Sequence, residues 1–521
     1  MQPWQDILAT AVVGTDQHEL ALPSRGDQLG QLLDQITGTD PEGSLLSAAS
    51  LLVLYRRAGF APPIDPQVLP DQCANDEAIC SSSASGQHLA MMLEGEFKEV
   101  LPEWLAAIAR AGKRVPEEHL PALLDRGRAE LSLREMIVAV QGKRGEWLAT
   151  QNPEWTYATP RNDTEVWETG TRDERLLLLD NTRARDSARA RDLLSATWQQ
   201  ESSKDRVAFL EKLALGASPD DEAFLNEALR DRSAEVRRAT RKILPRLPNS
   251  PFSMRLKDLT AQVLTLKKPL LGKLRIDVSL PDDPQARLKE NGIEIDSPPR
   301  TSGAQPLGTK AWCLKEMIAL TPITHWVELW QKTPGEIVSA AFESEWVKAF
   351  SEGFVLAVRR DRDPEWIEAL LAHWLNEAKK TVDYSSPLEL APYLPVARLE
   401  ALIFTLLKAA SKGLNDTHQA LRFLLVHRNP WNDQLSRSVI SSIKARIPRI
   451  RKEETIDWQT RAALKQFAHH VSPALYDELA SGWPMEAEGW PQWSKGVDAF
   501  TSLLAFRRDM HNAILAGEQK S

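Results

Sequence analysis

The stretch SPDDEAFLNEALRDRSAEVRRATRKILPRLPNS, residues 218–250, decides the fold of this 521-residue chain. Ser218 and Pro219 are typical of a helix start, and apolar residues follow them at helical spacing. After a turn at Asp231, Ser233 is a candidate cap for a second helix. That helix carries apolar residues three and four positions apart and ends at two prolines. The stretch therefore predicts a helical hairpin.

A weaker copy of this hairpin lies upstream, in DERLLLLDNTRARDSARARDLLSATW. Ser187 and Arg191 of the copy match Ser233 and Arg237 at an offset of 46 residues. Repeats of roughly 40–47 residues are typical of HEAT and armadillo arrays. A third amphipathic segment separates the copies, so two-helix and three-helix repeats both stay open.

Residues 236–244 resemble the HEAT signature, and this resemblance extends over residues 172–248. In HEAT proteins an aspartate of the turn and an arginine of the second helix often pair between adjacent repeats. The resemblance implies that role for Asp231 and Arg237. It also implies that the hairpins stack into an α-solenoid.

One segment departs from the helical pattern. GKLRIDVSL, residues 272–280, alternates apolar and polar side chains as a half-buried strand does. Asn291-Gly292 is a good turn, and residues 293–295 are expected to pair back as a second short strand. We therefore predict a predominantly all-α, HEAT/armadillo-like α-solenoid with one short β-hairpin insertion. The predicted parts are an N-terminal helical region at 1–168, HEAT-like repeats at 169–270, the hairpin with an irregular connection at 271–310, and a C-terminal helical region at 311–521. Whether the first region continues the array or forms a separate bundle stays open.

Composition restricts the compartment and the partners. The net charge is −8, so contact with nucleic acid would need a local basic face. Three cysteines indicate a reducing compartment without a disulfide framework. The N-terminus lacks a basic region like that of a signal peptide, and the apolar run at 45–55 is too short to span a membrane. We expect a cytoplasmic protein without membrane insertion, and a buried core helix at 45–55.

Tryptophan is frequent, with 17 copies. The tripeptide PEW occurs at residues 102–104, 153–155 and 364–366, where proline and glutamate favour a helix start. We expect these tryptophans, together with Trp326 and Trp493, to be core anchors between stacked helices rather than ligand-stacking residues.

Signatures of catalysis and cofactor binding are missing from the sequence. It contains no Walker A loop, no G-x-G-x-x-G after a strand, no G-x-S-x-G and no H-E-x-x-H. Cys73 and Cys80 have poor spacing for zinc, and no histidine pair has metal-ligand spacing with carboxylates. We expect neither a metal nor a cofactor, and a binding protein is favoured over an enzyme.

Two basic clusters are candidates for binding a partner or an anion. Lys143 and Arg144 follow Gly142, where free helix amides could hold an anion. A tight turn with a glycine C-cap is the favoured explanation, because no strand precedes this loop as a phosphate loop requires. Residues 230–246 contain seven basic residues and only two acidic ones. A solvated outer face is favoured over a binding groove there, because charge runs usually solvate helices. The candidate residues of this second cluster, all expected to face solvent, are Arg232, Arg238, Arg241 and Lys242.

Five stretches resemble an uncharacterised bacterial family, known for gene neighbourhoods with MoxR-type AAA ATPases and von Willebrand A-domain proteins. They are WQDILATAVVGTD (4–16), LPEWL (101–105), GKRGEWLATQNPEW (142–155), DRSAEVRRAT (231–240) and HRNPWNDQLSRSVI (427–440). The resemblance implies a non-catalytic helical component of such a system and supplies no active-site residues.

Our leading hypothesis is a non-catalytic α-solenoid scaffold or adaptor that binds a protein partner, such as an AAA ATPase or a von Willebrand A-domain protein. The alternative is a nucleic-acid-binding or DNA-processing protein with an Arg-rich face, like the alkylpurine DNA glycosylases with HEAT-like repeats. The acidic net charge disfavours that alternative. A third hypothesis is a phosphate-ligand enzyme built around Lys143 and Arg144.

Overall fold

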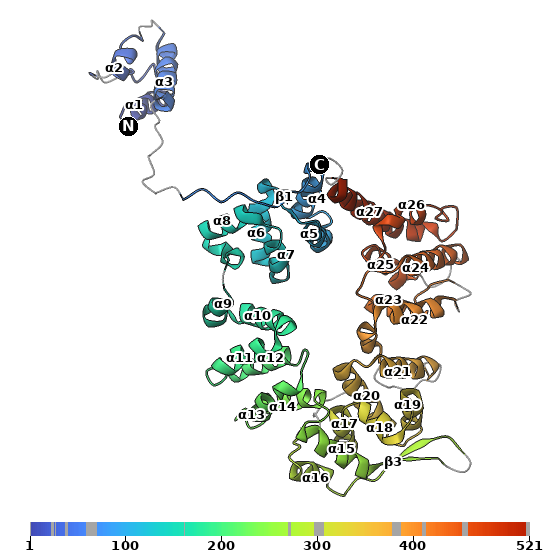
Figure 1. The fold of residues 1–521 in the computed structure, drawn as a ribbon. Coiled ribbons are helices and arrows are strands. Elements are labelled where there is room, and N and C mark those ends of the chain that lie inside the picture. The colour runs from blue at the N-terminus through green and yellow to red at the C-terminus, as the bar shows by residue number, and fades with distance from the viewer. Residues whose placement is uncertain are drawn as a thin grey trace. The chain divides into compact units, whose positions relative to one another are not determined.

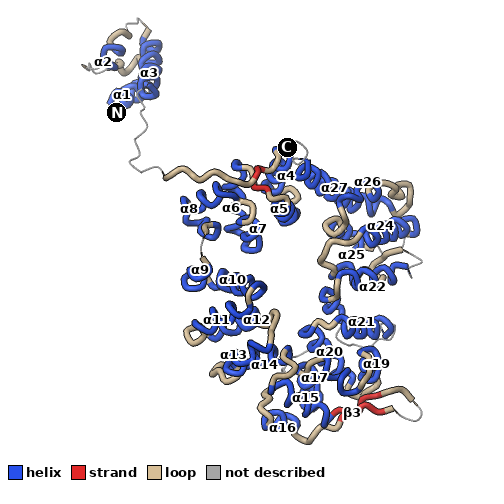
Figure 2. Tube along the Cα trace, viewed as in Figure 1, coloured by secondary structure: helices blue, strands red, loops and turns tan. Residues whose placement is uncertain are grey.

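The structure of the chain is a computed structural model. It is predominantly α-helical and repeat-like, with 71% of the described residues in helices, and two small two-stranded sheets lie within those residues (Figures 1 and 2). Internal contacts divide the chain into two units, Met1–Gln72 and Cys73–Ser521. The structure describes residues 2–21, 26, 28–36, 40–58, 70–160, 162–268, 272–295, 307–377, 387–408, 413–450 and 457–516.

The first unit consists of the helices α1 (Gln2–Val13), α2 (Gln28–Leu33) and α3 (Pro41–Ala58). The apolar run at 45–55 lies within α3, but it is not the fully buried helix that its composition predicts. Only Ala48 and Leu52 of α3 are buried. A unit of this size cannot surround a helix, so α3 buries one face only. The core of the unit comprises Ile7, Leu29, Leu33, Ala48 and Leu52.

The second unit begins with a short parallel strand pair, β1 (Ile79–Cys80) and β2 (Lys113–Arg114). Around this pair lie α4 (Ser83–Glu94), η1 (Lys98–Val100), α5 (Leu101–Arg110), η2 (Glu117–His119), α6 (Leu120–Ala129), η3 (Leu131–Leu133), α7 (Arg134–Val138), α8 (Gly142–Gln151) and η4 (Pro153–Ala158).

The helical hairpin predicted from residues 218–250 is present. Its first arm is η5 (Pro219–Asp221) with α13 (Glu222–Ala228), and its second arm is α14 (Ala234–Ile243). The amide of Ser218 donates to the carboxylate of Asp221 at 2.9 Å, which is one half of a capping pair. Ser233 is the N-cap residue of α14, but its side chain makes no capping hydrogen bond. The neighbouring elements are α9 (Asp163–Thr169), α10 (Arg172–Arg185), α11 (Ser187–Thr197), α12 (Ser203–Leu213), η6 (Leu244–Arg246) and α15 (Pro251–Val263).

A β-hairpin follows α15, and its second strand is the one that the alternation predicts. This strand, β4 (Arg275–Val278), pairs antiparallel with β3 (Leu264–Lys267). The predicted partner at 293–295 is wrong, because the chain forms the short helix α16 (Pro284–Glu290) just before it and Ile293 is buried in the helical core. The strand therefore pairs with the chain before it, not after it.

The remaining elements of the second unit continue the helical pattern. They are α17 (Thr309–Leu320), α18 (Thr324–Trp330), α19 (Pro334–Phe342), α20 (Val347–Asp361), α21 (Pro364–Glu377), η7 (Pro387–Tyr393), α22 (Val396–Lys408), α23 (Gln419–Val426), α24 (Asp433–Arg446), η8 (Ile447–Arg449), α25 (Trp458–Phe467), η9 (Pro473–Leu475), α26 (Tyr476–Leu479) and α27 (Trp490–Leu515). Four of the five predicted tryptophan anchors are fully buried, namely Trp104, Trp326, Trp366 and Trp493. The fifth, Trp155 of η4, is only partly buried, and its ring nitrogen donates to Asp125 at 2.9 Å.

Two large hydrophobic clusters hold the second unit together. One contains buried residues of 89–158 and of 264–514, and the other contains buried residues of 167–320. Helix α17 belongs to both, with Leu314 and Ile318 in the first cluster and Cys313 and Met317 in the second. No such shared helix lies at the other junction in the described part of the chain, where the first cluster ends at Ala158 and the second begins at Trp167.

The second unit closes on itself, because its last helix packs against its first ones (Figure 1). Phe506 of α27 stacks on Phe97, with ring centroids 4.3 Å apart. The Arg507 guanidinium pairs with the Glu103 carboxylate of α5 at 2.7 Å. The ammonium group of Lys113 donates to the carbonyl of Ile514 at 2.6 Å. The solenoid of the second unit is therefore a closed frame rather than an open array.

Candidate functional site

The first candidate anion site, at Lys143 and Arg144, is occupied by a carboxylate of the protein itself. Gly142 has φ +65°, and the amide of Lys143 at the start of α8 donates to Asp76. The ammonium group of Lys143 pairs with Glu146 at 2.9 Å, while Arg144 is exposed. Asp76 therefore lies where an external anion would bind. No local sequence signal links Asp76 to a loop 67 residues away.

The second basic cluster divides between surface and interior. Three of its residues are exposed, namely Arg232, Arg238 and Lys242. Arg241 is only 8% exposed, and it pairs with Glu294 at 2.9 Å. The prediction that Arg241 faces solvent is wrong, because Glu294 in the chain after α16 covers that side of α14. The structure keeps this cluster on and beside α14, apart from the Lys143 pair on α8.

Buried arginines bind the HEAT-like helices to one another. Asp221 is fully buried, and it accepts hydrogen bonds from Arg183 and, at 2.7 Å, from Arg191. Burial raises the pKa of Asp221, but the hydrogen bonds from Arg183 and the Ser218 amide outweigh burial and hold that pKa below its ordinary value. These cations stabilise the stack of helices.

The pairing within this segment differs from the one that the HEAT resemblance implies. The carboxylate of Asp231 accepts from Arg206 of α12 at 2.6 Å, not from Arg237. Arg237 instead donates to the main-chain carbonyl of Asp231 at 2.8 Å. Arg191, the counterpart of Arg237 in the upstream copy, makes the bond to an aspartate of the next hairpin that the family pattern describes.

A cluster of histidines lies at the ends of α23 and α25. His427 is buried, and desolvation with the nearby His470 lowers its pKa to about 4. The rings of Trp431 and His470 stack at 5.5 Å. His427 is therefore neutral near pH 7. Across the described ranges, no three histidine, cysteine or carboxylate side chains come together in a geometry that would hold a metal ion.

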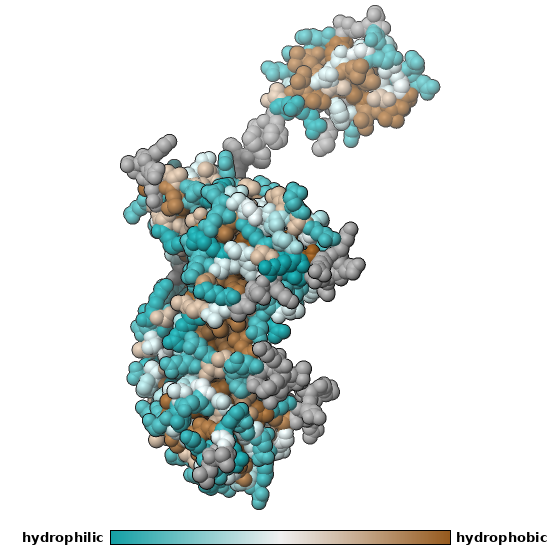
Figure 3. Space-filling model, turned by 90° about the vertical axis from the view of Figure 1, so that its right-hand side faces the viewer, coloured by the Kyte–Doolittle hydropathy of each residue, from teal (hydrophilic) through white to brown (hydrophobic). Residues whose placement is uncertain are grey.

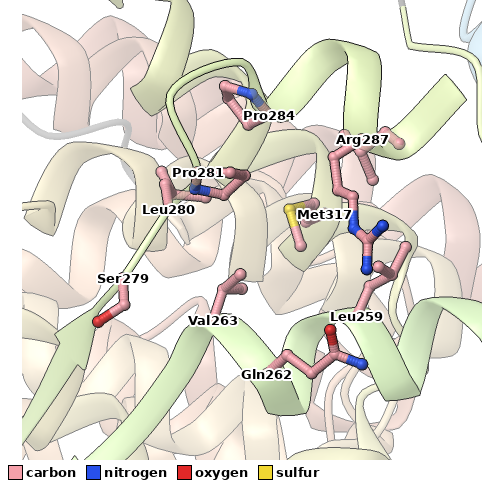
Figure 4. Close-up of a pocket in the computed structure, with 10 residues that line it drawn as sticks. Leu259, Gln262, Val263, Ser279, Leu280, Pro281, Pro284, Arg287 and Met317 are labelled. Carbon is pink, nitrogen blue, oxygen red and sulfur yellow. The ribbon is translucent and has the colours of Figure 1, made fainter. Parts of the chain in front are cut away.

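A pocket of about 340 Å³ lies between α15, α16 and α17 beside the end of β4 (Figure 4). Its walls are mainly apolar, with Val263 and Met317 toward the middle of the view. The Arg287 side chain at its edge is 54% exposed and lies 3.7 Å from the Glu290 carboxylate. No charged side chain of the described lining is buried, so the pocket lacks the group that would orient a charged substrate.

A second concave site, the α7–α10 groove, lies where the two hydrophobic clusters are separate. It has a volume of about 460 Å³ and is bounded by η3, α7, η4, α9 and α10. Three large apolar side chains in its lining are exposed: Leu131 by 48%, Val138 by 44% and Leu177 by 39%. The charged side chains of its lining carry both signs: Arg134, Glu135, Asp173, Glu174 and Arg185.

Contacts across this groove include polar ones. The side-chain amide of Asn181 in α10 donates to Glu135 in α7. The Arg134 guanidinium lies 4.7 Å from the centre of the Tyr157 ring, and burial raises the pKa of Tyr157 to about 12. Tyr157 is therefore neutral, and it lines the groove without serving as a base.

Comparison with known proteins places the chain in a family. The model of a family of unknown function, DUF5691, matches residues 6–514. The chain belongs to this family. No curated protein and no solved structure matches the chain. Membership of DUF5691 agrees with the resemblance to an uncharacterised family and carries no assigned site.

The DUF5691 chain has one further surface of note, on its first unit, which the sequence interpretation missed. Figure 3 shows apolar side chains gathered on the visible face of this unit. The most exposed large apolar side chains of the unit are Leu8 (54%) and Val12 (80%) of α1, and Leu46 (68%) and Leu54 (64%) of α3. Within the described residues, no helix is both long enough and apolar enough to be a membrane span. The spacing of these apolar residues along the sequence was the signal that could have predicted this surface.

Proposed function

We propose that this protein is a non-catalytic helical-repeat scaffold that binds a protein partner, and that the partner docks in the α7–α10 groove. The observation that carries this proposal is the exposure of Leu131, Val138 and Leu177 on one cavity. Contiguous apolar surface in water is unfavourable, and a partner that covers it gains roughly 25 cal/mol per Å².

The groove fits a protein segment better than a small polar substrate. Its volume of about 460 Å³ accommodates a few apolar side chains. The charged side chains around the apolar residues carry both signs: Arg134 and Arg185 are positive, and Glu135 and Asp173 are negative. Such a rim favours a segment with apolar anchors and mixed charges, because each rim charge then meets an opposite one.

The partners of the buried charged groups support a binding role over catalysis. Arg183, Arg206 and Arg507 are all buried, and each is bonded to a carboxylate of the protein. The neutral, buried His427 lies in a packed aromatic cluster. Groups that catalysis would place at a cleft are thus used to hold helices together.

Within this proposal, the resemblance to a family from MoxR gene neighbourhoods makes an AAA ATPase or a von Willebrand A-domain protein the partner of first choice. The nucleic-acid alternative has less support. Arg241, one of the cations that it needs, is buried against Glu294 and is not available to a phosphate.

A pair of matched variants tests the proposal. Leu177 and Leu425 are each 39% exposed, but Leu425 lies on α23, away from the groove. Proteins that co-purify with the tagged full chain from its native host would be identified for wild type, Leu177→Arg and Leu425→Arg. We expect one partner to be lost with Leu177→Arg only, and its purified form to bind that variant at least ~10-fold more weakly.

Equal binding of the partner by both variants would contradict docking in the groove. Salt-dependent binding of duplex DNA, lost on Arg238→Glu with the fold intact, would favour the nucleic-acid alternative instead.

A further inference from the structure

We propose that the outward face of α3 binds the same face of α3 in a second copy of this chain, with the two helices antiparallel. This inference is independent of the proposed groove. It rests on the exposure of one face of α3, on the spacing of the residues along that face and on the charges at its two ends.

The outward face of α3 lies opposite its buried residues. Ala48 and Leu52 belong to the core of the first unit. Because an α-helix turns by about 100° per residue, the positions on the opposite side are 46, 50, 53, 54 and 57, with 42 at the edge of that face. The large apolar side chains there are Leu46, Val53 and Leu54, which are 68%, 44% and 64% exposed. Spacings of three, four and seven residues are those of a helix-pairing face.

This face has opposite charges at its two ends. Glu42 lies in the first turn of α3 and Arg57 in the last turn, and both are exposed. The hydroxyl of Thr15 lies 3.3 Å from the Glu42 carboxylate, which brings the end of α1 to the start of α3. Each charge also suits its helix end, since carboxylates are favourable at the N-terminus and guanidinium groups at the C-terminus.

The order of residues on the face is self-complementary in the antiparallel direction. When two copies align about the exposed Ser50, Glu42 of one chain comes close to Arg57 of the other. Leu46 then lies opposite Val53 and Leu54, and the small Ser50 meets its own copy at the two-fold axis. A parallel pair would instead place Glu42 against Glu42 and Arg57 against Arg57. An isologous, two-fold contact of this kind is the commonest form of homo-oligomer.

Charge also disfavours a lipid surface as the occupant of this face. Residues 1–72 contain nine acidic and three basic side chains. Interfacial membrane helices usually carry lysine and arginine on their polar face, because lipid headgroups are commonly anionic. A second copy of α3 supplies both the apolar surface and the opposite charges that the face needs.

The oligomeric state of the full chain tests the inference directly. Sedimentation velocity would be measured from about 1 µM to about 100 µM, because a contact made mainly by one helix is small and association is expected to be weak. We expect a monomer–dimer equilibrium for wild type. Leu54→Glu places a charge in the apolar face and should weaken dimerisation at least ~10-fold. A monomer throughout this range would overturn the inference, as would a dimer that Leu54→Glu leaves unchanged.

A charge exchange separates this contact from a simple loss of folding. Glu42→Arg alone and Arg57→Glu alone each bring like charges together across the proposed axis, so each should weaken the dimer. The double variant restores opposite pairs and should recover dimerisation relative to Glu42→Arg. Arg56→Glu makes the same charge change about 100° around the helix and should have little effect. Failure of the double variant to recover would overturn the antiparallel register.

A cysteine at the proposed axis gives the last test. Mild oxidation of the Ser50→Cys chain should produce a covalent dimer on a non-reducing gel, because the two introduced thiols face each other. Gln31→Cys, on an exposed position of α2, and wild type with its native cysteines are the controls. Equal cross-linking of Ser50→Cys and Gln31→Cys would show that α3 does not form the contact.

Discussion

Asp221 shows what single charged residues do in this protein. It is fully buried between helices, where an unpaired carboxylate would be very unfavourable, and two arginines and one amide bond to it. Arg183 is equally dependent on Asp221, because it too is buried. The pair fixes the register of α10 and α11 against the start of the next hairpin.

We expect Asp221→Asn to lower the free energy of unfolding by about 3–5 kcal/mol, because it leaves the Arg183 charge buried without its counter-ion. Asp220→Asn changes the exposed neighbouring carboxylate and should cost less than about 0.5 kcal/mol. Urea unfolding followed by circular dichroism measures both. Similar losses for the two variants would mean that Asp221 has no special role.

At the scale of elements, α17 packs closely against α20. Gly353 lies inside α20, where a Cβ atom would be 2.8 Å from Ile318 and 3.0 Å from the Lys315 carbonyl. Only glycine allows the two helices to approach this closely. The close contact is significant because α17 also contributes to both hydrophobic clusters.

We expect Gly353→Ala to destabilise the protein by about 1–3 kcal/mol, although alanine is the better helix former, because the helices must separate. Gly335 in the first turn of α19 has open space around its missing Cβ. Gly335→Ala should therefore be neutral or stabilise by up to about 1 kcal/mol. Thermal unfolding of the two variants distinguishes the outcomes, and a stable Gly353→Ala protein would contradict the close packing.

At the scale of the whole second unit, closure depends on α27 meeting α4 and α5. Burial raises the pKa of Glu103, but hydrogen bonds from His511 and Arg507 outweigh burial and bring that pKa down to about 2. Arg507 also donates to the carbonyl of Val471 at 2.7 Å, so it joins α27 and α5 to the chain after α25. An apolar contact between Phe97 and Phe506 adds to this closure.

We expect Glu103→Gln to cost about 2–3 kcal/mol, less than a fully buried pair, because the Glu103 side chain is 25% exposed. Hydrogen exchange should rise in α4, α5 and α27 but not in α10–α14. Asp509→Asn on the same α27, whose partner is the adjacent Arg508, is the control. Uniform exchange across the unit would indicate that closure is not a local contact.

The contribution of Glu103 to the free energy of unfolding should also depend on pH. The folded-state pKa of Glu103 is about 2 and its ordinary value is 4.5, so its stabilising effect is complete above about pH 4.5. The effect should disappear as pH falls toward about 2, because both states then bind the proton. The difference in urea midpoint between wild type and Glu103→Gln would shrink over this interval, and a constant difference would contradict the assignment.

The sequence by itself determined the elements that depend on local chemistry. Apolar spacing with a serine cap and prolines predicted the hairpin of α13 and α14, and alternation predicted β4. The Pro-Glu-Trp starts predicted three buried tryptophans, of which Trp104 and Trp366 are fully buried and Trp155 is only partly buried. Each of these signals depends on residues a few positions apart, which is the range over which backbone propensity and side-chain periodicity act.

Only the tertiary structure decided which charges are structural and where the chain closes. Asp76 binds the Lys143 amide, Glu294 binds Arg241, and Glu103 meets Arg507 from the opposite end of the second unit. These contacts join residues far apart in sequence, and no local pattern encodes a partner that only folding brings within hydrogen-bonding distance.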